Sequence, residues 1–163
     1  MEIRRAGDHL ELTEVDPFLT ELLRQIPASI DPSGHAGAEQ RLYSRPANDE
    51  EICGEWKLYV EPELRRLFQS ATEAVAGDLA QLNGSNAPFR NCKLRIPLVN
   101  AEAWLNTLNQ ARLVIAAKYE FSENELGEHY RSPIGSRRDL ALFQVNFYGF
   151  LQECLLRETA GEQ

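Results

Sequence analysis

Three polar residues fall on predicted helix faces that are otherwise apolar, and they are the strongest candidates for a buried site. Arg112 projects between Leu105 and Leu108 when the residues of a helix over 101–119 are placed about 100° apart. Asp78 and Gln144 occupy the same kind of position on two other predicted helices. An arginine that is buried without a partner is costly, so this residue type at this position demands acceptors.

The three side chains are chemically compatible with one another. A guanidinium has five N–H donors, and a carboxylate together with an amide can accept several of them. We therefore predict a buried polar cluster of Arg112, Asp78 and Gln144, with Glu158 as a further candidate partner of Arg112. The interpretation we favour is a cluster that fixes helix register, and the alternative is a site where Arg112 binds a ligand carboxylate.

The best metal-ligand set lies in a polar segment near residue 125. Its members are Glu123, Glu125, Glu128 and His129. Gly127 interrupts the segment and no second histidine lies nearby, whereas a metal site needs several ligands at fixed spacing. We interpret the segment as a solvated loop and expect neither a metal nor a cofactor.

Nucleophilic and phosphate-binding chemistry leave no signature in the chain. The sequence contains no Gly-x-Ser-x-Gly, no Gly-x-Gly-x-x-Gly, no Gly-Lys-Ser/Thr and no zinc-deaminase pattern. None of the three cysteines stands beside a plausible histidine–acid pair. We expect a protein that is not an enzyme.

Charge argues against nucleic acid and membrane as partners. The 163 residues carry a net charge of −8, which repels phosphate backbones and anionic lipid. Some basic residues do gather in two connections: Arg90, Lys93, Arg95, Arg131, Arg137 and Arg138. We interpret them as an ordinary solvated surface, with a patch for an acidic partner or a nucleic acid as the alternative, since no pair of helices has helix-turn-helix spacing.

Length and cysteine usage predict a single cytoplasmic domain over residues 1–163. The chain is long enough for one core, and no stretch approaches the roughly 18 apolar residues of a membrane span. The first residues lack the apolar run of a signal peptide. Cys53, Cys92 and Cys154 are odd in number and widely spaced, as is typical of reduced thiols.

The elements that must position these residues are mostly helical. Turn and periodicity signals predict an N-terminal hairpin around Ala6–Asp8, then a helix capped by Asp16–Pro17 that Pro27 ends. A loop fills 28–48, with at most one helical turn near 39–43. The extended piece 93–96 is a candidate third strand beside the hairpin.

Four apolar stripes follow the first helix. The segment from Asp49 has its apolar face at Ile52, Cys53, Trp56, Tyr59 and Val60, and Pro62 then begins a new helix or a kink. The helix over 62–82 is expected to bury Leu64, Leu67, Phe68, Ala71, Val75, Leu79 and Leu82. With the helices over 101–119 and from Ser136 to about Arg157, the fold class is mainly α: a helical bundle with a small N-terminal β-hairpin.

The last helix carries a second apolar patch on its back. Leu142, Val145 and Leu156 must be covered either by the chain itself or by a second subunit. Because three residues make a small patch, we favour a monomer over a homodimer.

Two runs and one helix start carry a family resemblance. They are Asp16-Pro17, the run from Trp104 to Val114 and the run from Tyr148 to Arg157. In this order the chain resembles, from roughly Leu10 to Arg157, a bacterial family known only as domain of unknown function 2017. The resemblance implies a mostly helical cytoplasmic protein without an established activity. In some bacteria such genes lie beside the gene for the Clp protease adaptor, and some members carry the label of transcriptional regulator.

Together these observations favour a non-enzymatic cytoplasmic interaction or regulatory protein with a protein partner, linked through the resemblance to Clp-dependent proteolysis. A nucleic-acid-binding transcriptional regulator is the first alternative. A small-ligand-binding protein that uses Arg112 is the second.

Overall fold

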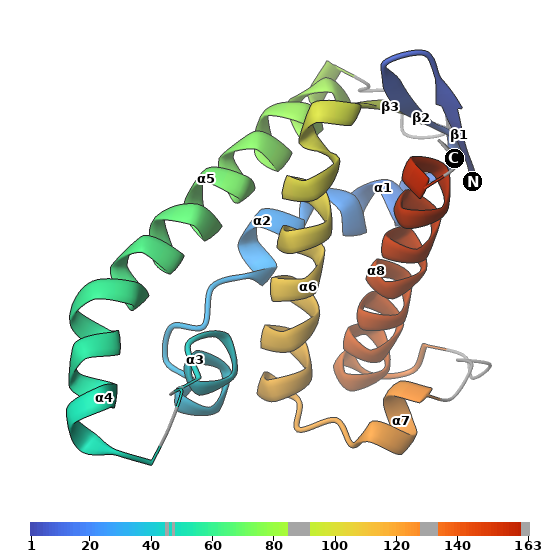
Figure 1. The fold of residues 1–163 in the computed structure, drawn as a ribbon. Helices are drawn as coiled ribbons and strands as arrows, with labels where there is room; N and C mark the ends of the chain where they lie inside the picture. Colours follow the sequence, from blue (N-terminus) through green and yellow to red (C-terminus); the bar gives the residue numbers. More distant parts are fainter. Residues whose placement is uncertain (45, 47, 85–91, 128–133, 161–163) are drawn as a thin grey trace.

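A small antiparallel sheet lies at one end of a set of helices (Figure 1). The computed structural model describes residues 1–44, 46, 48–84, 92–127 and 134–160. In the described part the strands are β1 (Glu2–Ala6), β2 (His9–Val15) and β3 (Cys92–Pro97), in the order β1-β2-β3. Gly7 turns the hairpin at a φ of +67°, a conformation that glycine adopts without strain. Both the N-terminal hairpin and the third strand were predicted from the sequence, and both are confirmed.

The first helices follow local signals with one correction. Asp16 caps α1 (Pro17–Arg24) by accepting a 2.9 Å hydrogen bond from the Leu19 backbone N–H. Pro27 does not end this helix as predicted, because it stands in the first turn of α2 (Ile26–Ser29), where its missing N–H costs nothing. Helix α3 (Ala36–Leu42) then replaces part of the expected loop.

Pro62 shapes the long segment that follows. Helix α4 (Glu50–Glu55) continues through a π-helical turn, η1 (Trp56–Val60), into α5 (Glu61–Leu79). Proline lacks an N–H and crowds the carbonyl four residues before it, so a widened turn ahead of it relieves the clash. The Glu61 N–H accordingly bonds to the Trp56 carbonyl, five residues back. Pro62 therefore stands in the first turn of α5 as predicted, but the backbone before it stays helical through η1 instead of ending.

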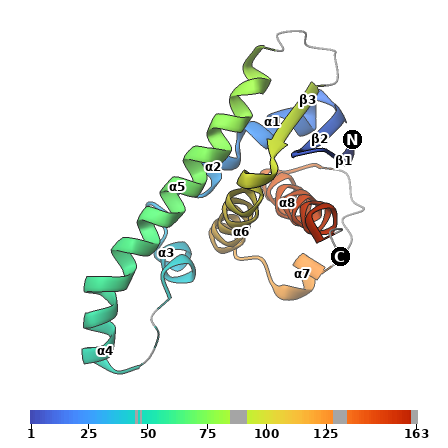
Figure 2. The same cartoon turned by 45° about the horizontal axis from the view of Figure 1, so that its top comes forward.

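The remaining elements complete the body of the protein. A 3-10 segment, η2 (Ala80–Gly84), leads toward β3, and another, η3 (Leu98–Asn100), precedes α6 (Ala101–Lys118). Short α7 (Glu123–Gly127) and long α8 (Arg137–Ala160) follow. Helices α6 and α8 run side by side against the sheet (Figure 2). The core comprises the inner faces of β2 and β3, α1, the C-terminal part of α5, α6 and α8.

Two predicted apolar faces are only partly buried. On α5 the buried apolar residues are Val75 and Leu79, whereas Leu67 is 60% exposed and Leu64, Phe68 and Ala71 are partly exposed. The body simply does not reach the first half of α5. On the back of α8, Val145 is buried, Leu142 is half-buried and Leu156 is exposed, so the chain itself covers part of that patch. No helix in the described residues is long and apolar enough to cross a membrane.

Candidate functional site

Asp78 is buried, as predicted, but its partners come from the start of α6. The Trp104 indole N–H donates a 2.9 Å hydrogen bond to one Asp78 carboxylate oxygen. The Asn100 side-chain amide donates to both oxygens at 3.1 Å. The carboxylate therefore fixes the approach of α6 to α5, and no bond to Arg112 is present among the described residues.

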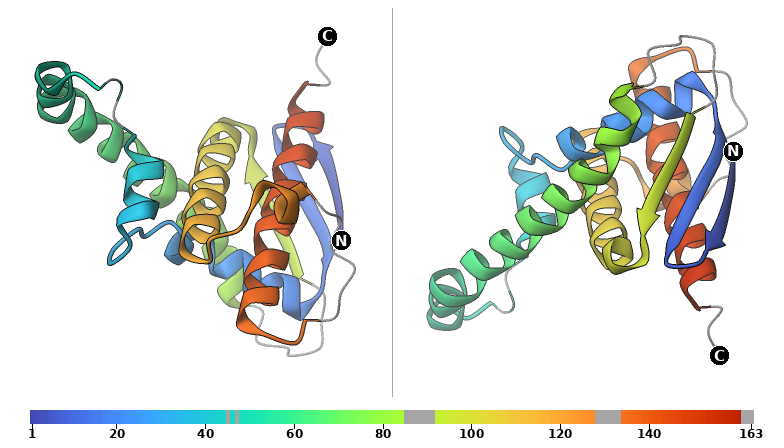
Figure 3. Two further views of the ribbon diagram at one scale, coloured as in Figure 1. Left: turned by 90° about the horizontal axis from the view of Figure 1, so that it is seen from below. Right: turned by 90° about the horizontal axis from the view of Figure 1, so that it is seen from above.

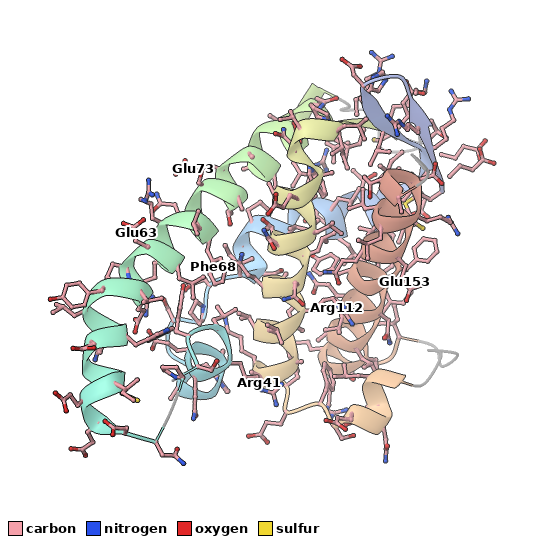
Figure 4. All side chains as sticks on the ribbon, viewed as in Figure 1. Arg41, Glu63, Phe68, Glu73, Arg112 and Glu153 are labelled. Atoms are coloured by element: carbon pink, nitrogen blue, oxygen red, sulfur yellow. The ribbon has the colours of Figure 1, made fainter. Side chains whose placement is uncertain are left out.

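Arg112 extends from α6 toward α8 instead (Figure 4). It lies about 12 Å beyond Trp104 along the helix axis and is rotated by about 80°, so Asp78 is out of its reach. One guanidinium nitrogen donates a 2.6 Å bond to the Gln152 side-chain oxygen, and the Gln152 amide donates to the Leu105 carbonyl. The guanidinium lies flat on Gly149, where an added Cβ would come within 3.2 Å of it. Arg112 is thus half-buried and links α6 to α8 through its hydrogen bond to Gln152.

Gln144 is buried in a third location, between α8, α1 and α2. Its amide donates to the Tyr148 hydroxyl at 2.7 Å and to the Ser29 hydroxyl at 3.2 Å. The Tyr148 hydroxyl donates in turn to the Leu22 carbonyl. Burial raises the pKa of Tyr148 to about 12.

The prediction of one cluster formed by Arg112, Asp78 and Gln144 is therefore wrong. Helical periodicity gives the face of a residue and not its height along the partner helix. Each of the three residues instead binds its own pair of helices. Glu158 is no partner of Arg112 either, since it accepts a bond from the Arg5 backbone N–H.

The predicted metal-ligand segment near residue 125 has a structural role in the part that the structure describes. Glu128 and His129 lie outside the described residues. Glu125 pairs with Arg138 at 2.6 Å and accepts bonds from Ser122, and this pairing lowers its pKa to about 2. Elsewhere in the described chain, no three His, Cys, Asp or Glu side chains stand close enough together to hold a metal.

The basic residues of the two connections are partly neutralised. Arg90 and Arg131 lie outside the described part of the structure. Arg95 on β3 and Arg4 on β1 flank the buried Glu11 of β2, at 3.2 and 3.0 Å. Arg138 has its carboxylate partner in Glu125. Such pairing is typical of a solvated charged surface. Lys93 and Arg137 are exposed and form no ion pair among the described residues, so two of the six basic residues keep their charge unpaired.

A pocket that the sequence did not predict opens between α2, α3, α5 and α6. It has a volume of about 400 Å³. Its apolar wall is formed by Pro27, Ile30, Pro32, Tyr43, Phe68 and Ala76. Gln110 of α6 also lines it and is only 3% exposed, and its enclosed amide nitrogen has no hydrogen-bond partner in the part of the chain that the structure describes. A sequence signal existed, because Gln110 stands on the predicted α6 helix, but its apolar surroundings come from distant segments.

Arg65 lies at the rim of this pocket. Its guanidinium stacks on the Tyr43 ring at 3.8 Å and pairs with Glu61 at 2.7 Å and Glu39 at 3.0 Å. The other two charged residues of the lining, Asp31 and Glu73, have no ion pair among the described residues, although the Lys118 ammonium donates a 2.7 Å bond to the Asp31 backbone carbonyl. The rim consequently carries an excess of negative charge.

The second unpredicted feature is a projecting arm, which we define as residues 50–74 of α4, η1 and α5. The arm extends away from the body (Figure 3), and it contains no buried residue. Its large exposed apolar residues are Ile52, Leu58, Tyr59, Val60 and Leu67. Phe68, on the inner side of α5 (Figure 4), marks where the arm meets the pocket.

Comparison with known proteins gives a family and no activity. The model of the family described as Domain of unknown function (DUF2017) matches residues 2–159. The chain belongs to this family. No curated protein and no solved structure matches it.

The extent of the DUF2017 match bears on both new features. The matched segment runs from the first residue of β1 to nearly the end of α8 and contains the arm and every residue that lines the pocket. Arm and pocket are therefore parts of the DUF2017 domain itself rather than an appended segment.

Proposed function

We propose that this DUF2017 protein is a non-enzymatic, cytoplasmic interaction protein and that the arm is its docking surface. The observation that carries the proposal is the set of large apolar residues that stay exposed along the arm, where the body covers neither η1 nor the first half of α5. Tyr59 is 69% exposed, Leu58 65% and Leu67 60%, on one projecting segment. Exposed apolar residues gathered in this way are typical of protein-binding surfaces.

Charge selects the kind of partner. The arm contains six glutamates against three basic residues. Arg65 and Arg66 already pair with glutamates of the arm, whereas Glu50, Glu51 and Glu55 have no ion pair among the described residues. The occupant that fits this surface is a cationic amphipathic segment of another protein. A second copy would bring the same acidic arm and a further charge of −8, so we expect a monomer.

A model peptide tests this surface directly. We expect an amphipathic helix of leucine and lysine to bind the arm and to change the fluorescence of Trp56, which lies in η1. Replacing Tyr59 and Leu67 by serine should weaken binding at least about tenfold, because the apolar contact is lost. Val99→Ser is the matched control, since Val99 is also exposed and lies in η3 on the body. Equal binding by all variants, equal binding of a leucine–glutamate peptide, or a dimer that the arm double variant dissociates would each refute the proposal.

The link to Clp-dependent proteolysis is the finer part of the proposal and rests on the resemblance. Capture from the native lysate with wild type, the arm double variant and Val99→Ser tests it. Clp components that bind wild type and Val99→Ser but not the arm variant would support the link. Their absence from the wild-type capture would remove it and leave the peptide result as the measure of the arm.

A further inference from the structure

Gln110 is an unusual residue for the place it occupies. The buried polar side chains of Asp78 and Gln144 have hydrogen-bond partners, whereas the enclosed amide nitrogen of Gln110 has none among the described residues. Leaving a buried donor unpaired costs stability, and a leucine of similar size would avoid that cost. Buried polar groups that a protein leaves unpaired beside a cavity are candidates for ligand recognition.

Two other enclosed atoms of α6 also lack partners among the described residues. Comparing them with Gln110 shows which unpaired atom lies at the pocket. Thr107 Oγ1 and Arg112 Nε are also enclosed and have no hydrogen-bond partner among the residues that the structure describes. Neither residue lines the pocket, and Arg112 has its bond to Gln152. Only Gln110, among the buried residues of α6, combines an unpaired amide with a pocket of about 400 Å³.

We infer that this pocket binds a small, flat, uncharged molecule whose edge carries a carboxamide-like donor and acceptor. A glutamine amide presents one donor edge and one acceptor, and rotating it by 180° exchanges the two, so it pairs with another amide in a two-bond arrangement. The Phe68, Tyr43 and proline walls accept a flat apolar body. Asp31 and Glu73 at the rim disfavour an anion, and Arg65 is already held by two glutamates.

Benzamide and benzoate form a matched pair of probes for this inference. They have the same size and shape, but benzamide has the amide edge and benzoate is an anion. We expect millimolar benzamide to shift the side-chain amide signals of Gln110 in the NMR spectrum of the labelled protein. Benzoate should bind at least about tenfold more weakly. Equal binding of both probes, or no shift of the Gln110 signals with benzamide, would overturn the inference.

Two variants separate recognition from structure. Gln110→Leu should lose benzamide binding and raise the melting temperature by about 2–4 °C, because the unpaired amide is removed. Ala76→Trp should also abolish binding by filling the pocket, with Ser70→Trp as the control on the same helix outside it. A Gln110→Leu protein that binds benzamide as well as wild type, or that melts at a lower temperature, contradicts the assigned role. Neither variant touches the exposed residues of the arm, so this result is independent of the peptide experiment.

Discussion

Replacing Asp78 by alanine should destabilise the fold more than any exposed acidic substitution, and the structure gives the size of the effect. The change removes the acceptor of the Trp104 indole, whose ring is essentially fully buried. An orphaned N–H together with a lost hydrogen bond to a carboxylate costs about 2–3 kcal/mol. Asn100 is only half-buried and can turn to water, so its lost bonds add less than about 1 kcal/mol. The expected loss in the free energy of unfolding is about 3 kcal/mol.

Urea unfolding followed by circular dichroism measures this loss, and a cycle with Trp104→Phe assigns it. In the Trp104→Phe background the indole donor is gone, so Asp78→Ala should cost only about 1 kcal/mol and the coupling should be about 2 kcal/mol. Asp78→Asn keeps the size and one acceptor oxygen and should cost about 1 kcal/mol. Glu73→Ala, on the same helix and exposed, is the control and should change stability by less than about 0.5 kcal/mol. A loss below about 1 kcal/mol for Asp78→Ala, or no coupling to Trp104, would refute the reasoning.

Three further predictions follow from the polar contacts. Arg112→Met and Asp78→Asn should be additive within about 0.5 kcal/mol in urea unfolding, because the two side chains bind different helix pairs; a larger coupling would mean that they do meet. The Arg4 hydrogen bond lowers the pKa of Glu11 from 4.5 to about 2, so its contribution is present above pH 4.5 and lost as the pH falls toward 2; Glu11→Gln should flatten this acid limb, and an unchanged limb would contradict the pairing. Burial raises the pKa of Tyr148 from 10 to about 12, so the stability from its neutral form is lost as the pH rises between these values; ultraviolet titration should show one late-ionising tyrosine that Tyr148→Phe removes, and full ionisation near pH 10 would count against its burial.

Local chemistry explains which elements could be predicted from the sequence. Asp16 and Asp49 cap helices with their own side chains, and the Ser136 hydroxyl accepts a bond from the Asp139 backbone N–H at the start of α8. Pro62 indicates the position where the π-helical turn η1 gives way to the α-helix α5. These signals act over a few residues, so the sequence alone carries them.

The features that could not be predicted depend on contacts between segments that are far apart in the sequence. The stripe of α5 indicates that Leu64, Leu67 and Phe68 belong on an apolar face, but periodicity does not say whether the body is long enough to cover that face. In the same way, the stripe position of Arg112 gives the face of α6 on which it lies, while its partner depends on the relative height of α6 and α8. The pocket at Gln110 needs four segments to come together. The one signal in the sequence is a glutamine on a predicted helix, and it does not show that the other three segments enclose it.

The polar residues of α6 show how one helix divides structural from recognition roles. Asn100 and Trp104 donate to Asp78 and hold α5, and Arg112 reaches Gln152 and holds α8, so these groups gain hydrogen bonds from the folded chain alone. Gln110 stands between Trp104 and Arg112 in sequence and faces a third direction, toward α2, α3 and α5, where no described residue offers a partner for its amide nitrogen. If helix registration were the whole purpose of polar residues in α6, an apolar residue would serve better at this position. Retaining an amide there makes sense when a molecule outside the chain completes its hydrogen bonds, which is why Gln110 rather than Arg112 marks the binding site.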